Sequence, residues 1–315
     1  MKKILFGGLF LLFSGVAHAT PGVVVEAKGI VTAQFPGAKP KPAATGIEFP
    51  DGTKFVASKG ATATLMLMDG AMQTVVEGKN YIAGKVKPTK VATPTSQKLL
   101  VALNEAVQST GSGPTVHGMV KMTPGVPLYG EITPAPPIGG ITALFPNNTA
   151  LILPDAIRFQ WEAKNGLSGK NLAVVFFEKG KPQMNFPIKP ADSSVTLTAV
   201  QLQLQKGVNY YWYLGEKQGK EMIAKSQRFS VSILSDADEK LLAADLQEID
   251  LLGLTTAEGK NFLKSQVYYR YKMYAEMKTL LDDLYAKEPT IALKRLLFLT
   301  NVRLGNLAAA KQYQI

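Results

Sequence analysis

The sequence predicts a multidomain, mainly β protein with an α-helical C-terminal region. Both tryptophans stand in runs where apolar and polar residues alternate: Trp161 within residues 157–162 and Trp212 within residues 210–214. Such alternation is typical of strands with one buried face. Two strands of this kind predict two sheets that face each other across one core. After Ser235 the apolar residues recur every three to four positions, which predicts helices.

The first 19 residues have the three parts of a secretory signal. Lys2 and Lys3 precede an apolar run over residues 4–13, and Ala17-His18-Ala19 is a small-x-small cleavage site. We expect a cut between Ala19 and Thr20. A membrane anchor is the alternative, but the apolar run is about half of the ~20 residues that a transmembrane helix needs. The cut has no cysteine, so we expect a periplasmic or secreted protein that is not a lipoprotein and has no transmembrane segment after signal removal.

The chain has no cysteine and a formal net charge of +11. Disulfides and thiol chemistry are therefore excluded. Residues 20–130 carry 11 basic and 6 acidic side chains, residues 131–234 carry 11 and 7, and residues 235–315 carry 11 and 11. The excess of +5, +4 and 0 places the positive charge on the β-rich part. Outside the cytoplasm this indicates anionic envelope polymers or lipid headgroups and not nucleic acid; a merely solubilising lysine surface is the alternative.

Residues 20–95 predict a small β module, because short β-like runs are separated by glycines and Asp69-Gly70 is a strong hairpin signal. With Gly29-Ile30-Val31, residues 51–56 and Gly60-Ala61-Thr62-Ala63, this segment resembles the FecR-like domain of bacterial envelope proteins. The resemblance implies an extracytoplasmic all-β domain. Regulatory members of that family sense a neighbouring receptor and signal across a membrane.

Residues 96–140 predict a helix followed by a Pro/Gly-rich linker. Leu99, Leu100, Leu103 and Val107 have helical spacing behind Ser96, which we expect to be the N-cap. From Gly111 onward, proline and glycine are frequent and periodicity is weak, as in an extended linker.

Residues 141–234 have the pattern of a two-sheet sandwich. The pattern is Phe159-x-Trp161, the apolar run 172–177, Tyr210-x-Trp212-x-Leu214 and Phe229-x-Val231. It resembles fibronectin type III and related immunoglobulin-like domains. Leu204 and Tyr210 have the spacing of the tyrosine corner of such domains, in which the hydroxyl bonds back to the backbone.

Residues 235–315 predict helical hairpins. Ser235 with Asp238, and Thr255 with Glu258, are helix-start signals. From Tyr274 to Leu307 is 33 residues, and this period resembles tetratricopeptide-like hairpins. We expect a short helical region at the end of the chain, with fewer repeats than the three that such arrays usually need.

The sequence predicts no catalytic site, no metal site and no cofactor. Ser112 and His117 are the only serine–histidine candidates, and they lie in the predicted flexible linker, which cannot fix their geometry. Carboxylate pairs for a hydrolase exist at Glu216 with Glu221 and at Asp282-Asp283. Solvated surface charge explains both pairs better.

Tyrosines supply the remaining candidate sites. Tyr211 and Tyr213 alternate with Trp212, so they point to the other sheet face, where they could stack on a sugar ring or pair across strands. Four helical tyrosines cover more than one helix face, which indicates either internal packing or a partner. They are Tyr268, Tyr269, Tyr271 and Tyr274.

Together these features predict a non-enzymatic, exported cell-envelope protein that acts as a binding or scaffolding module. The expected partner is peptidoglycan, another anionic polymer or a protein. The first alternative is a FecR-type sensor or regulatory accessory that works through a membrane partner. The second is a carboxylate-based hydrolase.

Overall fold

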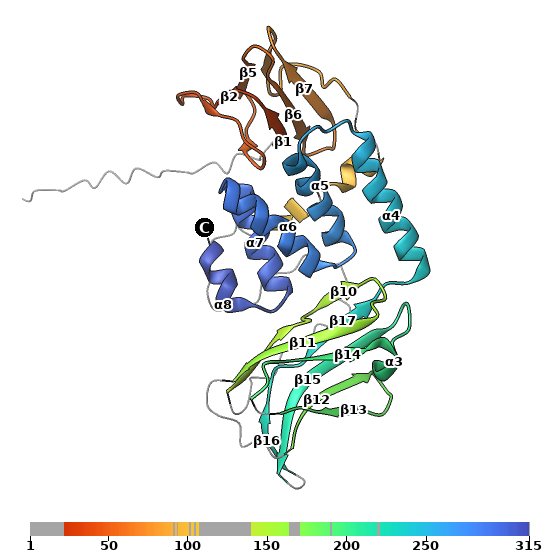
Figure 1. Cartoon of the computed structure of the whole chain (residues 1–315). Coiled ribbons are helices and arrows are strands. Elements are labelled where there is room, and N and C mark those ends of the chain that lie inside the picture. Colours follow the sequence, from red (N-terminus) through yellow and green to blue (C-terminus); the bar gives the residue numbers. More distant parts are fainter. Residues whose placement is uncertain are drawn as a thin grey trace, which may run out of the picture.

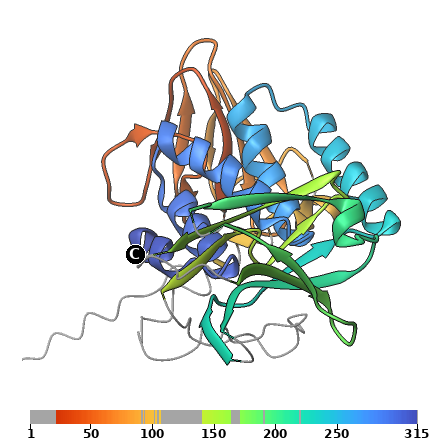
Figure 2. The ribbon, with the colours of Figure 1, turned by 60° about the horizontal axis from the view of Figure 1, so that its bottom comes forward.

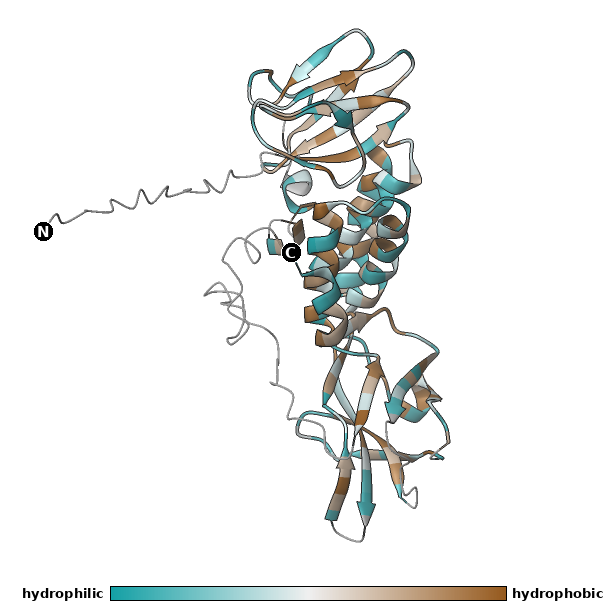
Figure 3. Ribbon diagram, turned by 90° about the vertical axis from the view of Figure 1, so that its left-hand side faces the viewer, coloured by the Kyte–Doolittle hydropathy of each residue, from teal (hydrophilic) through white to brown (hydrophobic). Residues whose placement is uncertain are grey.

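The computed structural model describes residues 22–90, 92, 94–100, 102–103, 105–106, 140–163, 171–189, 191–218 and 221–314. Three parts lie in a row: an N-terminal β module, the C-terminal helices and a second β module (Figures 1 and 3). The helices come last in the sequence and lie in the middle in space. The predicted signal cleavage site at Ala19 and Thr20, and residues 107–139 of the predicted linker, lie outside the described residues. Among the helices described, none combines the length and the apolar character that a membrane span requires.

The N-terminal module consists of two four-stranded antiparallel sheets, in the orders β4-β1-β6-β7 and β3-β2-β5-β8. Phe49, Phe55 and Leu65 are fully buried in its core, and the two phenylalanine rings meet edge to face at 4.9 Å. The predicted hairpin at Asp69-Gly70 joins β6 to β7. The strands are β1 (Gly22–Lys28), β2 (Val31–Gln34), β3 (Lys41–Pro42), β4 (Glu48–Phe49), β5 (Lys54–Ala57), β6 (Thr62–Leu67), β7 (Met72–Val76) and β8 (Asn80–Ile82).

The second module is a sandwich of one three-stranded and one six-stranded sheet. The sheet orders are β14-β11-β9 and β10-β17-β15-β12-β13, with β16 paired to β15. A short helix, α3 (Ala199–Leu202), follows β14. The strands are β9 (Ile141–Phe145), β10 (Thr149–Leu151), β11 (Ala156–Ala163), β12 (Leu172–Glu178), β13 (Met184–Pro187), β14 (Ser194–Thr198), β15 (Asn209–Gln218), β16 (Glu221–Lys225) and β17 (Phe229–Ile233).

Both tryptophans lie in the core of this sandwich, as the sequence predicts. Trp161 is 2% exposed and Trp212 is fully buried, with its ring edge-to-face against Phe159 at 4.9 Å. The Tyr210 hydroxyl donates to the Gln203 carbonyl at 3.1 Å and accepts from the Gln205 amide at 2.8 Å. This is the predicted tyrosine corner, and with the sheet order it identifies an immunoglobulin-like sandwich.

The C-terminal helices form two successive hairpins with short turns. Ser235 caps the first helix as predicted, with its side chain accepting from the Asp238 amide. The second helix start lies one residue later than the sequence indicates: Thr256 is the N-cap of α5, and Thr255 donates hydrogen bonds to Glu26. The helices are α4 (Asp236–Leu251), α5 (Ala257–Arg270), α6 (Tyr274–Lys287), α7 (Ile291–Arg303) and α8 (Leu307–Ala310), followed by the 3-10 turn η1 (Lys311–Tyr313).

The helices share one hydrophobic core with the N-terminal module. Val23 and Val25 of β1, Phe262 of α5 and Leu296 of α7 belong to the same buried cluster. So do Leu99, Leu100 and Leu103, which follow the short helix α1 (Pro94–Lys98). Because α1 begins at Pro94, Ser96 lies within it and is not the predicted N-cap. Figure 2 shows the helices against the N-terminal strands from a second side. Residues of the C-terminal helices and of the N-terminal module are therefore buried in one common cluster.

Candidate functional site

A buried carboxylate joins the N-terminal module to the helices. Glu26 of β1 is 3% exposed, and its two oxygens accept from the Thr255 amide at 2.9 and 3.1 Å and from the Thr255 hydroxyl at 2.5 Å. The register between β1 and β6 shifts between Val24 and Glu26. Such a bulge re-aims side chains, and here the consecutive residues Val25 and Glu26 both reach the helices.

Helix α5 approaches the backbone of β1 closely at this joint. A Cβ atom on Gly259 would lie 3.0 Å from the Glu26 Cβ and 3.1 Å from the Val25 carbonyl oxygen. A side chain at this position would require the strand or the helix to shift by a few tenths of an ångström. The joint is therefore built for one fixed position of the helix on the strand.

Two further carboxylates of the N-terminal half are held by helix arginines. Arg295 of α7 pairs with Glu48 of β4, and Arg303 pairs with Glu105. Three of the six acidic residues between positions 20 and 130 are thus used at the joint with the helices: Glu26, Glu48 and Glu105. None of these three interactions has a local signal in the sequence.

The surface of the N-terminal module is consequently more basic than its composition suggests. Its nine lysines form no ion pair within the described part of the chain. All are exposed except the half-buried Lys54. They are Lys28, Lys39, Lys41, Lys54, Lys59, Lys79, Lys85, Lys87 and Lys90.

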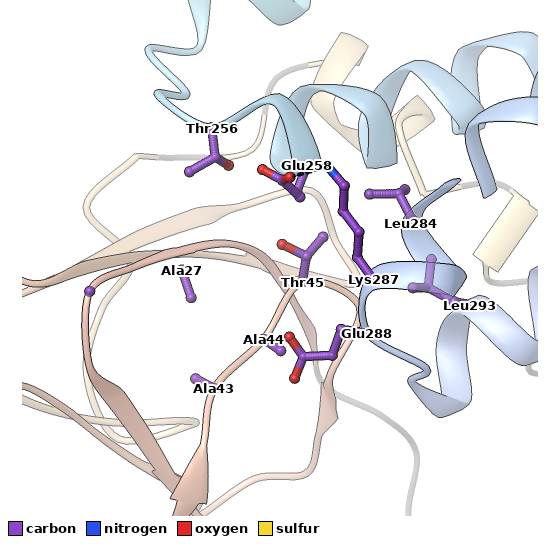
Figure 4. A pocket seen from close by; sticks show the side chains of 11 residues that line it. Ala27, Ala43, Ala44, Thr45, Thr256, Glu258, Leu284, Lys287, Glu288 and Leu293 are labelled. Atoms are coloured by element: carbon purple, nitrogen blue, oxygen red, sulfur yellow. Dashed lines mark hydrogen bonds and ion pairs between the residues drawn. The ribbon is translucent and has the colours of Figure 1, made fainter. Parts of the chain in front are cut away.

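A cavity of about 350 Å³ lies between the module and the helices (Figure 4). Alanines form one wall, and Thr45, Thr256 and Glu288 place polar atoms around it. Lys287 donates to Glu258 at 2.6 Å, and this hydrogen bond lowers the pKa of Glu258 and raises the pKa of Lys287. The lining has no histidine or cysteine and no paired nucleophile and base. We therefore interpret the cavity as a crevice between the N-terminal module and the helices.

Tyr211 and Tyr213 point away from the sandwich core but do not form an open platform. They are 9% and 6% exposed. The Lys225 ammonium lies 4.5 Å from the centre of the Tyr213 ring, and the Arg228 guanidinium lies 5.8 Å from that of Tyr211. Since cations of the same chain already cover these rings, a sugar could stack on them only by displacing those side chains.

The four helical tyrosines take part in internal packing. Tyr269 and Tyr274 are 7% and 9% exposed and belong to the shared core, while Tyr268 and Tyr271 pack against it. The Tyr269 hydroxyl donates to Glu105. The Tyr271 hydroxyl donates to Asp245 of α4 at 2.5 Å. These contacts explain the tyrosine clustering without a partner.

The two carboxylates of each sequence-predicted pair differ in exposure. Glu216 is 2% exposed within β15, and Glu221 is exposed at the start of β16. Asp282 pairs with Lys278 at 2.5 Å along α6, and Asp283 is exposed. Ser112 and His117 lie outside the described residues. In the part of the chain that the structure describes, no group of three or more His, Cys, Asp or Glu side chains could hold a metal.

No family model and no curated protein matches this sequence. Among solved structures, the chain is similar to a two-domain fibronectin type III segment from chicken tenascin. The two are 13% identical, the match covers 64% of this chain and 79% of that chain, and the TM-score is 0.20. Because this score is low, the immunoglobulin-like assignment rests on the sheet order and the tyrosine corner.

Proposed function

We propose that this chain is a non-enzymatic, exported scaffold of the bacterial cell envelope, which presents two basic β modules on a helical connector. The observation that carries the proposal is that three acidic residues of the N-terminal half bond to residues of the C-terminal helical part. Glu26 bonds to Thr255, and Glu48 and Glu105 pair with arginines of α7, whereas the nine lysines of the module form no ion pair in the described residues and eight of them are exposed. A surface of this kind attracts anionic polymers such as peptidoglycan.

Contacts between the helices and the sandwich support a connector with fixed geometry. The Ala150 amide of β10 donates to the Lys272 carbonyl at 2.8 Å. The Thr149 hydroxyl accepts from the Ala275 amide in the first turn of α6 at 3.2 Å. Both bonds involve backbone atoms, so they fix the direction of the strand relative to the helix. The two basic modules are therefore held apart at a set orientation.

The same geometry supports the finer family assignments. We propose that the N-terminal module is FecR-like and that α4 to α7 are two tetratricopeptide-like hairpins. Two hairpins are fewer than the three that usually give a stable array. In this chain the apolar surface of Val23, Val25, Leu99, Leu100, Ala102 and Leu103 belongs to the same core and replaces the missing repeat.

Co-sedimentation of the mature chain with purified peptidoglycan sacculi tests the proposal. We expect binding that weakens from low salt to ~0.15 M salt, where exposed charges are screened over about 8 Å. The double variant Lys85→Gln/Lys87→Gln should bind more weakly. The matched control Lys240→Gln/Lys311→Gln, which removes two exposed lysines of the helical part, should bind like the parent. Absence of binding, or binding that ignores salt, would refute the proposal.

A further inference from the structure

Three turns of the N-terminal module come together at one end of its strands. They are the turn 28–30 between β1 and β2, the turn 58–61 between β5 and β6, and the turn 76–79 between β7 and β8. The Ser58 amide donates to the Ile30 carbonyl at 3.0 Å, which joins the first two turns. The Gly60 amide donates to the Glu77 carboxylate at 2.8 Å, which joins the second and third.

We call this region the Lys-Gly tip, because a lysine adjoins a glycine in each turn: Lys28-Gly29, Lys59-Gly60 and Gly78-Lys79. All three glycines have positive φ. A Cβ atom on Gly29 would lie 3.0 Å from the Ala61 Cβ, so the first two turns are packed tightly. The tip is therefore a compact, well-defined surface.

The tip combines an exposed aliphatic side chain with positive charge. Ile30 is 71% exposed, although isoleucine is among the residues most often buried. Thr32 lies opposite Val56 across β2 and β5, so Ile30 and Val56 share the outer face of this sheet, and Val56 is 37% exposed. Lys28, Lys59 and Lys79 are exposed and have no ion pair in the described residues.

Only one acidic residue, Glu77, lies in the three turns, and its carboxylate accepts a backbone hydrogen bond. Glu77 accepts the hydrogen bond from Gly60 and so holds the turns together. The three turns therefore carry three exposed lysines, one carboxylate that accepts a backbone hydrogen bond, and one exposed aliphatic side chain. A hydrated polyanion would satisfy the ammonium groups but would gain nothing from the exposed Ile30 side chain.

We propose that the Lys-Gly tip docks on an anionic lipid surface, with the lysines at the phosphate groups and Ile30 inserted between headgroups. Basic side chains next to an exposed aliphatic residue are the recognised combination for an interfacial membrane contact. A protein partner fits less well, because a stable interface buries about 800 Å² on each side, and three short turns form a small surface. The inference goes beyond the proposed scaffold: one end of the molecule meets a membrane, and polymer contact is left to the remaining basic surface.

Sedimentation of the mature chain with vesicles tests this inference. The vesicles consist of phosphatidylcholine alone or mixed with phosphatidylglycerol. We expect binding to the mixed vesicles only. The variant Lys28→Gln/Lys59→Gln/Lys79→Gln should lose about fivefold in partitioning per lysine. A matched sandwich variant, Lys179→Gln/Lys189→Gln/Lys217→Gln, should bind like the parent.

The variant Ile30→Ser separates insertion from simple charge attraction. It should bind mixed vesicles roughly tenfold more weakly, in line with the loss of several buried methyl and methylene groups, and its salt dependence should be unchanged. Val200→Ser is the matched control, since Val200 is 86% exposed on α3 of the sandwich. All of these positions are exposed or in turns, and circular dichroism checks that each variant is folded.

Three results would overturn the inference: no preference for anionic vesicles, full binding by Ile30→Ser, or equal losses in the tip and sandwich lysine variants. Sacculi are tested in parallel on the same samples. Binding to sacculi without binding to vesicles refutes the lipid contact and leaves the scaffold proposal standing. Binding to vesicles without binding to sacculi refutes the scaffold proposal and leaves the lipid contact standing.

Discussion

Replacement of Trp212 by alanine should strongly destabilise the sandwich. The indole is fully buried, packs edge to face on Phe159 at 4.9 Å and lies 6.4 Å from the Phe229 ring. Its Nε1 donates to the Pro146 carbonyl. Removing a buried aromatic side chain of this size costs about 3–5 kcal/mol. Trp212→Phe keeps most of the packing but leaves the carbonyl unpaired, and should cost about 1–3 kcal/mol.

Urea unfolding followed by fluorescence measures both costs, because Trp161 remains as the single reporter in either variant. Val200→Ala, at a position that is 86% exposed, is the control and should change the free energy of unfolding by less than about 0.5 kcal/mol. A loss below about 1 kcal/mol for Trp212→Ala would refute the assignment of this side chain to a packed inter-sheet core.

Two further predictions concern buried hydroxyls. Tyr210→Phe removes the bonds to the backbone at Gln203 and Gln205, and should destabilise the sandwich by about 1–3 kcal/mol. Tyr211→Phe is the control, because the Tyr211 hydroxyl has no backbone partner among the described residues, and it should stay within about 0.5 kcal/mol in the same urea assay. Burial, with the hydrogen bond to Glu105, raises the pKa of Tyr269. The protonated Tyr269 side chain therefore contributes its full stabilisation of the folded state below the unfolded-state pKa of about 10. This contribution is lost as the pH rises from about 10 through the folded-state pKa. Tyr269→Phe should flatten the loss of stability that occurs above about pH 10, and an unchanged slope in that range would contradict this reasoning.

Local features were predictable from the sequence because each has a short-range physical cause. Alternation placed both tryptophans in facing sheets, and the six-residue spacing of Leu204 and Tyr210 predicted a corner that the Tyr210 hydrogen bonds confirm. The Asp69-Gly70 hairpin and the Ser235 cap depend on neighbouring residues in the same way.

The arrangement of the three parts was not predictable, since it depends on contacts between distant residues. Glu26 and Thr255 are separated by 229 positions, and nothing near either residue indicates the other. One signal was present: Val23, Val24 and Val25 form a continuous apolar run, which indicates a strand covered on both faces. In the structure Val24 faces the module core, and Val23 and Val25 face the helices.

The candidate site shows the same limit. Alternation correctly turned Tyr211 and Tyr213 away from Trp212, but it could not show that Lys225 and Arg228 cover their rings. Segment charges identified a basic N-terminal half. They could not show that Glu26 and two other acidic residues are used at the joint, while the lysines of the module form no ion pair in the described residues.

Hydrogen exchange on the full chain with Phe262→Ala tests most directly whether the helices and the N-terminal module form one unit. Phe262 of α5 is fully buried in the core that also contains Val23 and Val25. The cavity should cost about 3–5 kcal/mol, and we expect amide protection in β1 to fall by about the same factor as in α5, while β15 of the sandwich changes less. Loss of protection in α5 with unchanged protection in β1 would contradict the shared core, and with it the fixed joint on which the scaffold proposal depends.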